Sequence, residues 1–164
     1  MSPRSLFLVR HGRAVEDAPG GDAARALTAE GRGEVACVGR ALQAFGVRPD
    51  AIWHSPYARA LETAILLGEA LGVRKLVPES ALVPSSSAER ALRLVLEAAS
   101  PTLLVVSHMP LLPALAHEFL GARVDFGPAT VAHVAIFPGG ALLSGLWTAT
   151  QLSLVCLPSS GRSR

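Results

Sequence analysis

The stretch RSLFLVRHGRA, residues 4–14, places four apolar side chains directly before an arginine and a histidine. The apolar run from Leu6 to Val9 is too short for a helix and too uniformly apolar for a strand with one face in water. It therefore predicts a strand that is buried on both faces of a parallel sheet. This strand would end at Arg10 and His11, which makes its end a candidate functional site.

The rest of the chain alternates between helical and strand patterns. Helices are expected from the cap Thr28 to Gly46, from the cap Ser55 with Pro56 at the first helical position to Gly72, over 88–99, and from Pro110 to about Leu120. Further strands are expected over 51–54, 75–79, 102–107, 131–137 and 142–148, the last two joined by the turn PGG. This order predicts a three-layer α/β/α sandwich with a mostly parallel central sheet and a C-terminal hairpin.

Length and composition limit the possible classes of protein. The 164 residues, half of them hydrophobic, fit one domain over 1–150 and a partly disordered C-terminal tail over 151–164. The net charge of +2, with acids and bases interspersed, argues against a nucleic-acid partner. No apolar stretch approaches the roughly 18 residues of a membrane span, and a secretory signal is lacking, so we expect a cytoplasmic protein without a membrane partner.

Polar residues follow three of the predicted strands at the point where each strand ends. Arg10 and His11 follow the first, His54 follows the second with Arg59 shortly after it, and His108 follows the strand LLVVS. In open α/β sheets, ligands bind beyond the carboxyl ends of the strands. We therefore expect Arg10, His11, Arg59 and His108 to converge on one positively charged pocket, which suits phosphate.

This set of residues points to phosphoryl chemistry. Guanidinium groups bind phosphate oxygens in pairs and disfavour protonation of a neighbouring imidazole, so a neutral His11 could attack phosphorus and form a phosphohistidine. Gly12 would let the backbone approach the phosphate closely. A single histidine at a strand end is more often structural, and the repetition at three strand ends favours the catalytic interpretation. Without an HExxH motif or close Cys/His pairs, neither a metal nor another cofactor is expected.

Four motifs, in chain order, resemble those of the histidine phosphatase superfamily, also called the phosphoglycerate mutase-like family. They are LVRHG, ARALTAEGRGEVACVGRAL, SPYARALETA and VVSHMP. The short chain, the segment SHMPLLPALAHEFLG and the hairpin ending look most like the SixA-type phosphohistidine phosphatases of bacteria. The resemblance implies a phosphoglycerate mutase-like fold, His11 as the nucleophile, and Arg10, Arg59 and His108 as the phosphate clamp. It also suggests Arg25 as a further phosphate contact, with a solvated loop arginine as the alternative.

The resemblance leaves the general acid open. Family members that cleave phosphomonoesters protonate the leaving oxygen with a carboxylic acid, usually a glutamate after the third strand. Glu79 in LVPESAL is the best positional match, but the usual Gly-rich, acidic continuation is absent. Glu16, Asp17 and Asp22 in the first loop remain alternatives. The leaving imidazole of phosphohistidine needs less help than an alkoxide, so a poorly placed acid favours that substrate.

The leading hypothesis is therefore a metal-independent phosphatase that acts through a phosphohistidine on His11. Its substrate would be protein phosphohistidine, for example on a signalling protein. The enzymatic alternatives are a small-molecule phosphomonoesterase, which would act on small phosphate esters, and a phosphoglycerate mutase-like enzyme. The alternative outside enzymes is a module that binds phosphohistidine or another anion without turnover.

Overall fold

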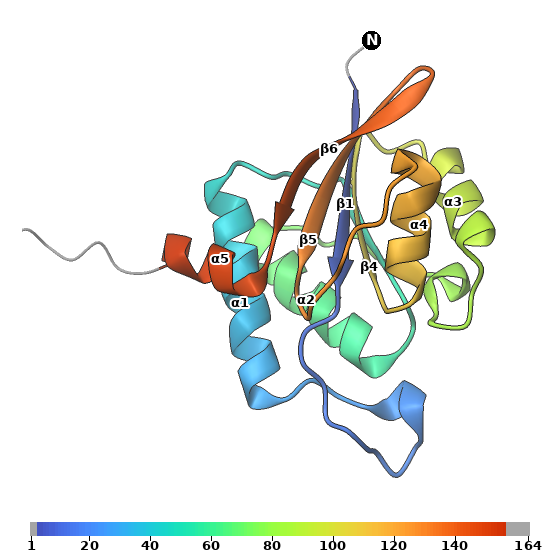
Figure 1. The fold of residues 1–164 in the computed structure, drawn as a ribbon. Helices are drawn as coiled ribbons and strands as arrows, with labels where there is room; N and C mark the ends of the chain where they lie inside the picture. Colours follow the sequence, from blue (N-terminus) through green and yellow to red (C-terminus); the bar gives the residue numbers. More distant parts are fainter. Residues whose placement is uncertain (1–2, 157–164) are drawn as a thin grey trace, which may run out of the picture.

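A six-stranded sheet separates two layers of helices in the computed structural model, which describes residues 3–156 (Figure 1). The strands are β1 (Arg4–Arg10), β2 (Ala51–His54), β3 (Leu76–Pro78), β4 (Thr102–Ser107), β5 (Val131–Phe137) and β6 (Gly140–Trp147). The helices are α1 (Ala29–Ala44), α2 (Ala58–Leu71), α3 (Ala88–Glu97), α4 (Leu111–Leu120) and α5 (Ala149–Ser153), with short 3-10 turns at Asp22–Ala24, Ser80–Leu82 and Leu154–Cys156. No helix in this described part of the chain is both long and apolar enough to cross a membrane.

The sheet has the strand order β3-β2-β4-β1-β5-β6. The first four of these strands are parallel, and β5 and β6 form an antiparallel hairpin at one edge. This arrangement confirms the predicted three-layer fold with its mostly parallel sheet. The predicted burial of the first strand on both faces is also confirmed, because each side chain from Leu6 to Val9 is at most 5% exposed.

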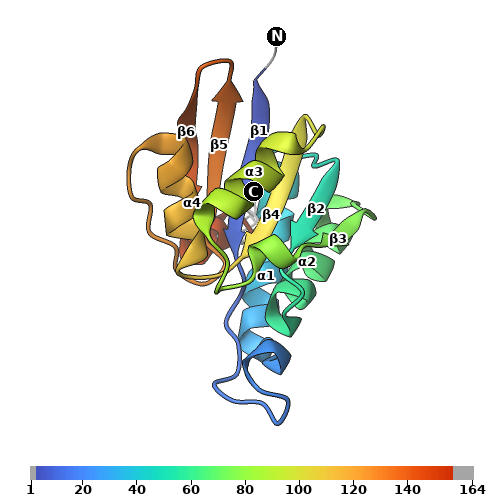
Figure 2. The same cartoon turned by 90° about the vertical axis from the view of Figure 1, so that its right-hand side faces the viewer.

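Successive side chains of β1 enter two separate cores, as the alternation along a strand requires. Leu6 and Leu8 pack in the core formed with α3 and α4, whereas Phe7 and Val9 pack in the core formed with α1 and α2. Figure 2 shows α3 and α4 in front of the sheet. The end of β1 is therefore held by apolar packing on both sides.

The helix boundaries follow the predicted signals with one exception. Thr28 caps α1, where its side chain accepts a hydrogen bond from the Gly31 amide, and Gly72 ends α2 in the left-handed conformation. The prediction that Ser55 caps α2 was wrong, because the helix begins only at Ala58. The Ser55 amide donates to Val106 O in β4, and its hydroxyl accepts from the Tyr57 amide in the turn that precedes the helix.

The C-terminal end differs in part from the expected tail. Residues 151–156 are helical, and Leu152 is 1% exposed in the core shared with α1. Thr148 and Gln151 form a capping box that starts α5. The remainder of the expected tail, residues 157–164, lies outside the described residues.

Candidate active site

Neighbouring strands end at one edge of the sheet, and the predicted clamp residues come together there. Arg10 ends β1 and is in register with Ser107, which ends β4. The His11 amide donates to Ser107 O at 3.1 Å, and the ring centroids of His11 and His108 are 5.0 Å apart. Arg59 lies in the first turn of α2, and its Nε is 3.3 Å from His11 Nε2.

The ring of His11 is buried and oriented by two contacts. Its Nδ1 is 2.7 Å from Gly12 O. Because a carbonyl only accepts, Nδ1 carries the proton and Nε2 has the lone pair, which accepts from Arg59 Nε. Burial is the largest cause that lowers the pKa of His11 to about 4, and Arg59, Arg10 and Arg25 lower it further. His11 is therefore neutral at pH 7, with Nε2 as its nucleophilic atom.

His108 provides two unused ring nitrogens beside His11. The residue is 1% exposed, and neither its Nδ1 nor its Nε2 has a hydrogen-bond partner among residues 3–156. Burial, followed by the proximity of His11 and Arg59, lowers its pKa to about 3. A buried polar group without a partner costs about 1–3 kcal/mol, so these atoms are suited to receive a ligand.

Arg59 is 4% exposed and uses all three guanidinium nitrogens. Besides the contact of Nε with His11, Nη1 donates to Asp22 O at 2.6 Å and Nη2 to Asp22 Oδ2 at 3.1 Å. The guanidinium lies over the Tyr57 ring, 5.1 Å from its centre, and Tyr57 in turn packs edge-on against His108. Arg59 is thus locked by stacking and by hydrogen bonds.

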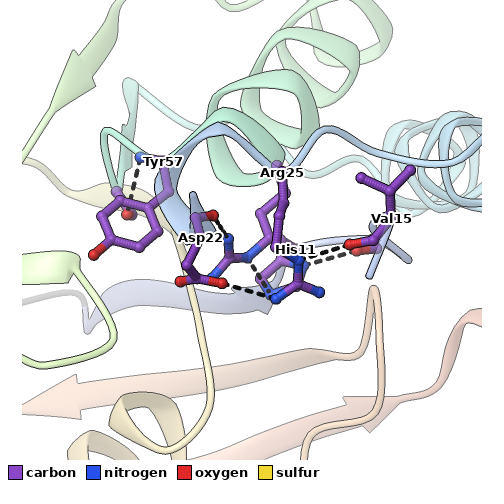
Figure 3. Close-up of polar contacts among 8 residues, drawn as sticks. His11, Val15, Asp22, Arg25 and Tyr57 are labelled. Atoms are coloured by element: carbon purple, nitrogen blue, oxygen red, sulfur yellow. Dashed lines mark hydrogen bonds and ion pairs between the residues drawn. The ribbon is translucent and has the colours of Figure 1, made fainter. Parts of the chain in front are cut away.

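Arg25 belongs to the same cluster through Asp22 (Figure 3). Its Nη1 donates to Asp22 Oδ1 at 2.8 Å, and its Nε donates to Val15 O at 2.6 Å. Hydrogen bonds from Arg25 and Arg59 hold the pKa of Asp22 below its usual value. Arg25 is therefore bonded to Asp22 and to its own loop, with a side chain that is 28% exposed, and its role as a phosphate contact stays a prediction.

Arg10 is held by a loop that precedes β5. Its Nη1 donates to Phe126 O at 2.8 Å, while its buried Nε has no partner among the described residues. The Arg10 amide donates to Thr130 O, and the Ala129 amide donates to His11 O. Ala129 has a φ of 54°, an uncommon conformation for alanine. The backbone of His11 is thereby bonded on one side to β4 and on the other to this loop.

Gly12 has a packing role in the fold. A Cβ at this position would lie 2.6 Å from Val35 Cγ2 and 3.1 Å from Gly31 O, both in α1. The Gly12 amide is already bonded to Thr63 Oγ1 at 3.1 Å. Glycine is therefore required here because the chain after β1 packs directly against α1, and close approach of its backbone to a phosphate stays a prediction.

The candidate acids lie at different places around the site. Glu79 follows β3 at the same sheet edge, where its amide donates to His54 O, and its carboxylate has no hydrogen bond or ion pair within the described ranges. Glu16 lines a cavity of about 410 Å³ beside His11, and Asp17 is exposed. Asp22 is the candidate that contacts clamp arginines.

Two parts of the site were not predicted from the sequence. Tyr57, which stacks on Arg59, lies within the motif SPYAR but has a side chain with no predicted role. In the sequence, residues 125–130 indicate only a turn around Gly127 and Pro128. The contacts of this loop with Arg10 form only in the folded chain. Among residues 3–156, no three His, Cys, Asp or Glu side chains are grouped to hold a metal ion.

Comparisons with known proteins agree with the predicted resemblance. The model of the histidine phosphatase superfamily (branch 1) matches residues 6–83. This match and the fold confirm the resemblance of the chain to the histidine phosphatase superfamily. A search of the curated proteins gives no significant match.

Solved structures show the same fold across nearly the whole chain. The protein histidine phosphatase SixA, complexed with tungstate, is 24% identical with a TM-score of 0.83, over 90% of this chain and 99% of that one. SixA from Agrobacterium tumefaciens is 22% identical with a TM-score of 0.80, over 90% and 99% of the two chains. Phosphoglycerate mutase from Bacillus anthracis is 15% identical with a TM-score of 0.69, over 93% and 96%. The fold is therefore phosphoglycerate mutase-like.

Proposed function

We propose that this protein is a phosphatase in which Nε2 of His11 accepts a phosphoryl group and water then hydrolyses the phosphohistidine. The observation that carries the proposal is the neutral His11, whose Nε2 is 3.3 Å from Arg59 Nε and whose ring lies 5.0 Å from that of His108. A nucleophile with its lone pair facing a phosphate-binding cation is the arrangement that covalent phosphoryl transfer needs.

The reaction proceeds in two displacements. In the first, Arg59 Nε transfers its hydrogen bond from His11 Nε2 to a phosphoryl oxygen, which frees the Nε2 lone pair. That lone pair then bonds to phosphorus while the bond to the leaving nitrogen or oxygen breaks. The leaving atom takes the electron pair of that bond and a proton, which comes from solvent for an imidazole and from a carboxylic acid for an alkoxide. In the second, a water oxygen bonds to phosphorus, the P–Nε2 bond breaks and its electrons return to His11, while the proton of water passes to solvent. Nδ1 keeps its proton throughout, because Gly12 O accepts it.

The clamp stabilises the charge of the transferring group. Arg59 and Arg10 bind its non-bridging oxygens, and the N–H of the neutral His108 ring, which has no partner among the described residues, donates to another oxygen. The side chains of Arg59 and Arg10 are held before the substrate arrives, Arg59 by stacking on Tyr57 and Arg10 by its bond to Phe126 O. Preorganised donors of this kind lower the barrier because they need not reorient during the reaction.

The substrate we propose is protein phosphohistidine. Imidazole is a good leaving group, and no carboxyl group within residues 3–156 forms a hydrogen bond or ion pair with His11 or His108. The likeness to the protein histidine phosphatase SixA supports the same substrate. For phosphate esters, whose leaving alkoxide needs a proton, we propose Glu79 as the acid, because its carboxylate is not bound by another described residue.

The proposal is tested by comparing a protein that bears phosphohistidine with alkyl and aryl phosphates as substrates. We expect faster turnover of phosphohistidine, and a phosphoenzyme that is lost in acid and kept in base, as a phosphorus–nitrogen bond requires. His11→Ala should remove both turnover and the phosphoenzyme, whereas Glu79→Gln should slow only the ester reactions. Faster turnover of alkyl phosphates would favour a phosphomonoesterase, and binding without any phosphate release would favour a binding module.

A further inference from the structure

The phosphate clamp already holds an anion that belongs to the chain itself. Asp22 bonds to Arg59 through its carbonyl oxygen and Oδ2, and to Arg25 through Oδ1, at distances of 2.6, 3.1 and 2.8 Å. The bonds to Arg59 involve Nη1 and Nη2, the pair of donors that suits two oxygens of a phosphoryl group. The charge of Asp22 also acts on His108, whose pKa it raises against the larger lowering by burial.

Asp22 lies in a loop over residues 15–26, called the flap below, whose two ends are joined to each other. An isolated β-bridge joins Ala14 to Leu27, and the Val15 amide donates to Ala26 O, so the chain leaves and rejoins the body at one place. Figure 1 shows this loop projecting away from the sheet between β1 and α1. Gly21, directly before Asp22, has a φ of 81° and a ψ of −170°, a conformation that is open essentially to glycine alone.

We propose that Asp22 is a specificity-determining residue whose carboxylate occupies the clamp in the free protein and must be displaced by the incoming phosphoryl group. The inference rests on the proposed function, because it takes Arg59 as a phosphate ligand. The side chain of Asp22 is 55% exposed, so movement of the flap can release it without opening the core.

Displacement favours some anions over others. A phosphoryl group brings three oxygens and up to two negative charges, and it can bind Arg59 together with Arg10 Nε and the N–H of His108, which have no partner among the described residues. A carboxylate or a singly charged anion has too few oxygens and too little charge to gain as much from these donors. Competition from Asp22 therefore lowers the affinity for every anion, and weakly bound anions are excluded first.

The test is equilibrium binding of inorganic phosphate and of tungstate, measured by titration calorimetry at constant ionic strength. The variant Asp22→Asn removes the competing charge and nearly preserves the shape of the side chain. We expect it to bind both anions about three- to tenfold more tightly than the unmodified protein, in keeping with the strength of a partly exposed ion pair. Acetate should gain measurable binding in this variant.

Asp17→Asn is the matched control, because it removes one negative charge from the same loop at an exposed residue. We expect it to change phosphate affinity less than twofold. If Asp22→Asn binds phosphate no more tightly than this control, the proposal is wrong. Weaker binding would also overturn it, since it would mean that Asp22 holds Arg59 in place for the ligand.

The same titrations separate this proposal from the proposed function. Binding needs no turnover, so a tighter Asp22→Asn variant supports the competing anion even if no phosphatase activity is found. Arg59→Ala should weaken phosphate binding at least tenfold, both in the unmodified protein and in the Asp22→Asn variant. If Arg59→Ala binds phosphate as well as the unmodified protein, the clamp itself fails, and the proposed function fails with it.

Discussion

The ends of β1 and β2 are built alike and differ in their surroundings. Each strand is followed or ended by a buried histidine whose Nδ1 contacts the carbonyl of the next residue, at 2.7 Å for His11 and 2.8 Å for His54. Around His11 lie Arg59, Arg10 and His108, whereas His54 accepts a backbone hydrogen bond from the Glu79 amide.

This comparison separates orientation from reactivity. The contact with the following carbonyl fixes the tautomer at both strand ends, and it follows from the local backbone. The cationic partner on Nε2 exists only at the end of β1, because the first turn of α2 directs Arg59 to that strand. A strand-end histidine is therefore oriented by its own chain and becomes a candidate nucleophile through its neighbours.

The strongest test of this comparison replaces each of the two histidines in a separate variant. His11→Asn removes the nucleophile, and we expect kcat/KM for an aryl phosphate to fall at least about a thousandfold. His54→Asn should change it by less than about fivefold, because only His11 carries a cation on Nε2. Initial rates measure both effects, and thermal unfolding shows whether each variant is folded. Comparable losses in the two variants would contradict the assignment.

A second test asks whether the paired guanidinium donors of Arg59 contribute to catalysis beyond the positive charge of the side chain. Arg59→Lys keeps the charge but loses the paired donors and the stacking on Tyr57, so we expect kcat/KM to fall about a hundredfold. Arg25→Lys, farther from His11 Nε2, should lower it less than about tenfold. Steady-state kinetics on the two variants decides this, and a larger effect at Arg25 would reverse the proposed order.

The depressed pKa values give a third prediction. His11 has a pKa of about 4, so it stays neutral and nucleophilic until the pH approaches that value, and its protonation then reduces kcat/KM. His11 and His108 bind fewer protons when folded than when unfolded, so stability is lost as pH falls from about 6.5 through their lowered values. NMR titration of the imidazole protons and unfolding at several pH values measure these effects. A His11 pKa near 6.5 would contradict them.

The smallest expected effect concerns the residue after each histidine. Ser55 is accommodated after His54, but Gly12→Ala would push its Cβ against Val35, and we expect a loss of about 1–3 kcal/mol in unfolding free energy. Gly33→Ala in α1 is the control, because its Cβ would meet nothing within 4 Å and should stabilise the helix by about 0.5–1 kcal/mol. Denaturant unfolding measures both, and a neutral Gly12→Ala would exclude the packing role.

Much of the fold could be predicted because its signals are local. Runs such as Leu6 to Val9 can only be buried strands, and Thr28 and Gly72 mark helix ends through bonds to their own neighbours. The convergence of Arg10, His11, Arg59 and His108 could be predicted as well, because parallel strands present their carboxyl ends at one edge.

The remaining features depend on contacts between distant segments. Asp22 meets Arg59 across 37 residues of sequence, and a side chain at position 12 would collide with α1. Ser55 closes a turn before the helix and does not cap it, and its amide bonds to β4, a contact that no local pattern contains. Such features require the tertiary structure.

The two backbone bonds of His11 have a practical consequence for engineering. His11 lies where the parallel strands meet the antiparallel hairpin, since its amide bonds to Ser107 and its carbonyl to Ala129. The turn at Pro138 and Gly139 lies at the opposite end of β5, because Arg4 pairs with Ile136 and Val9 with Val131. A fluorophore or affinity sequence inserted in that turn would leave the backbone bonds of His11 intact. One placed before β5 would disturb the bond between His11 and Ala129.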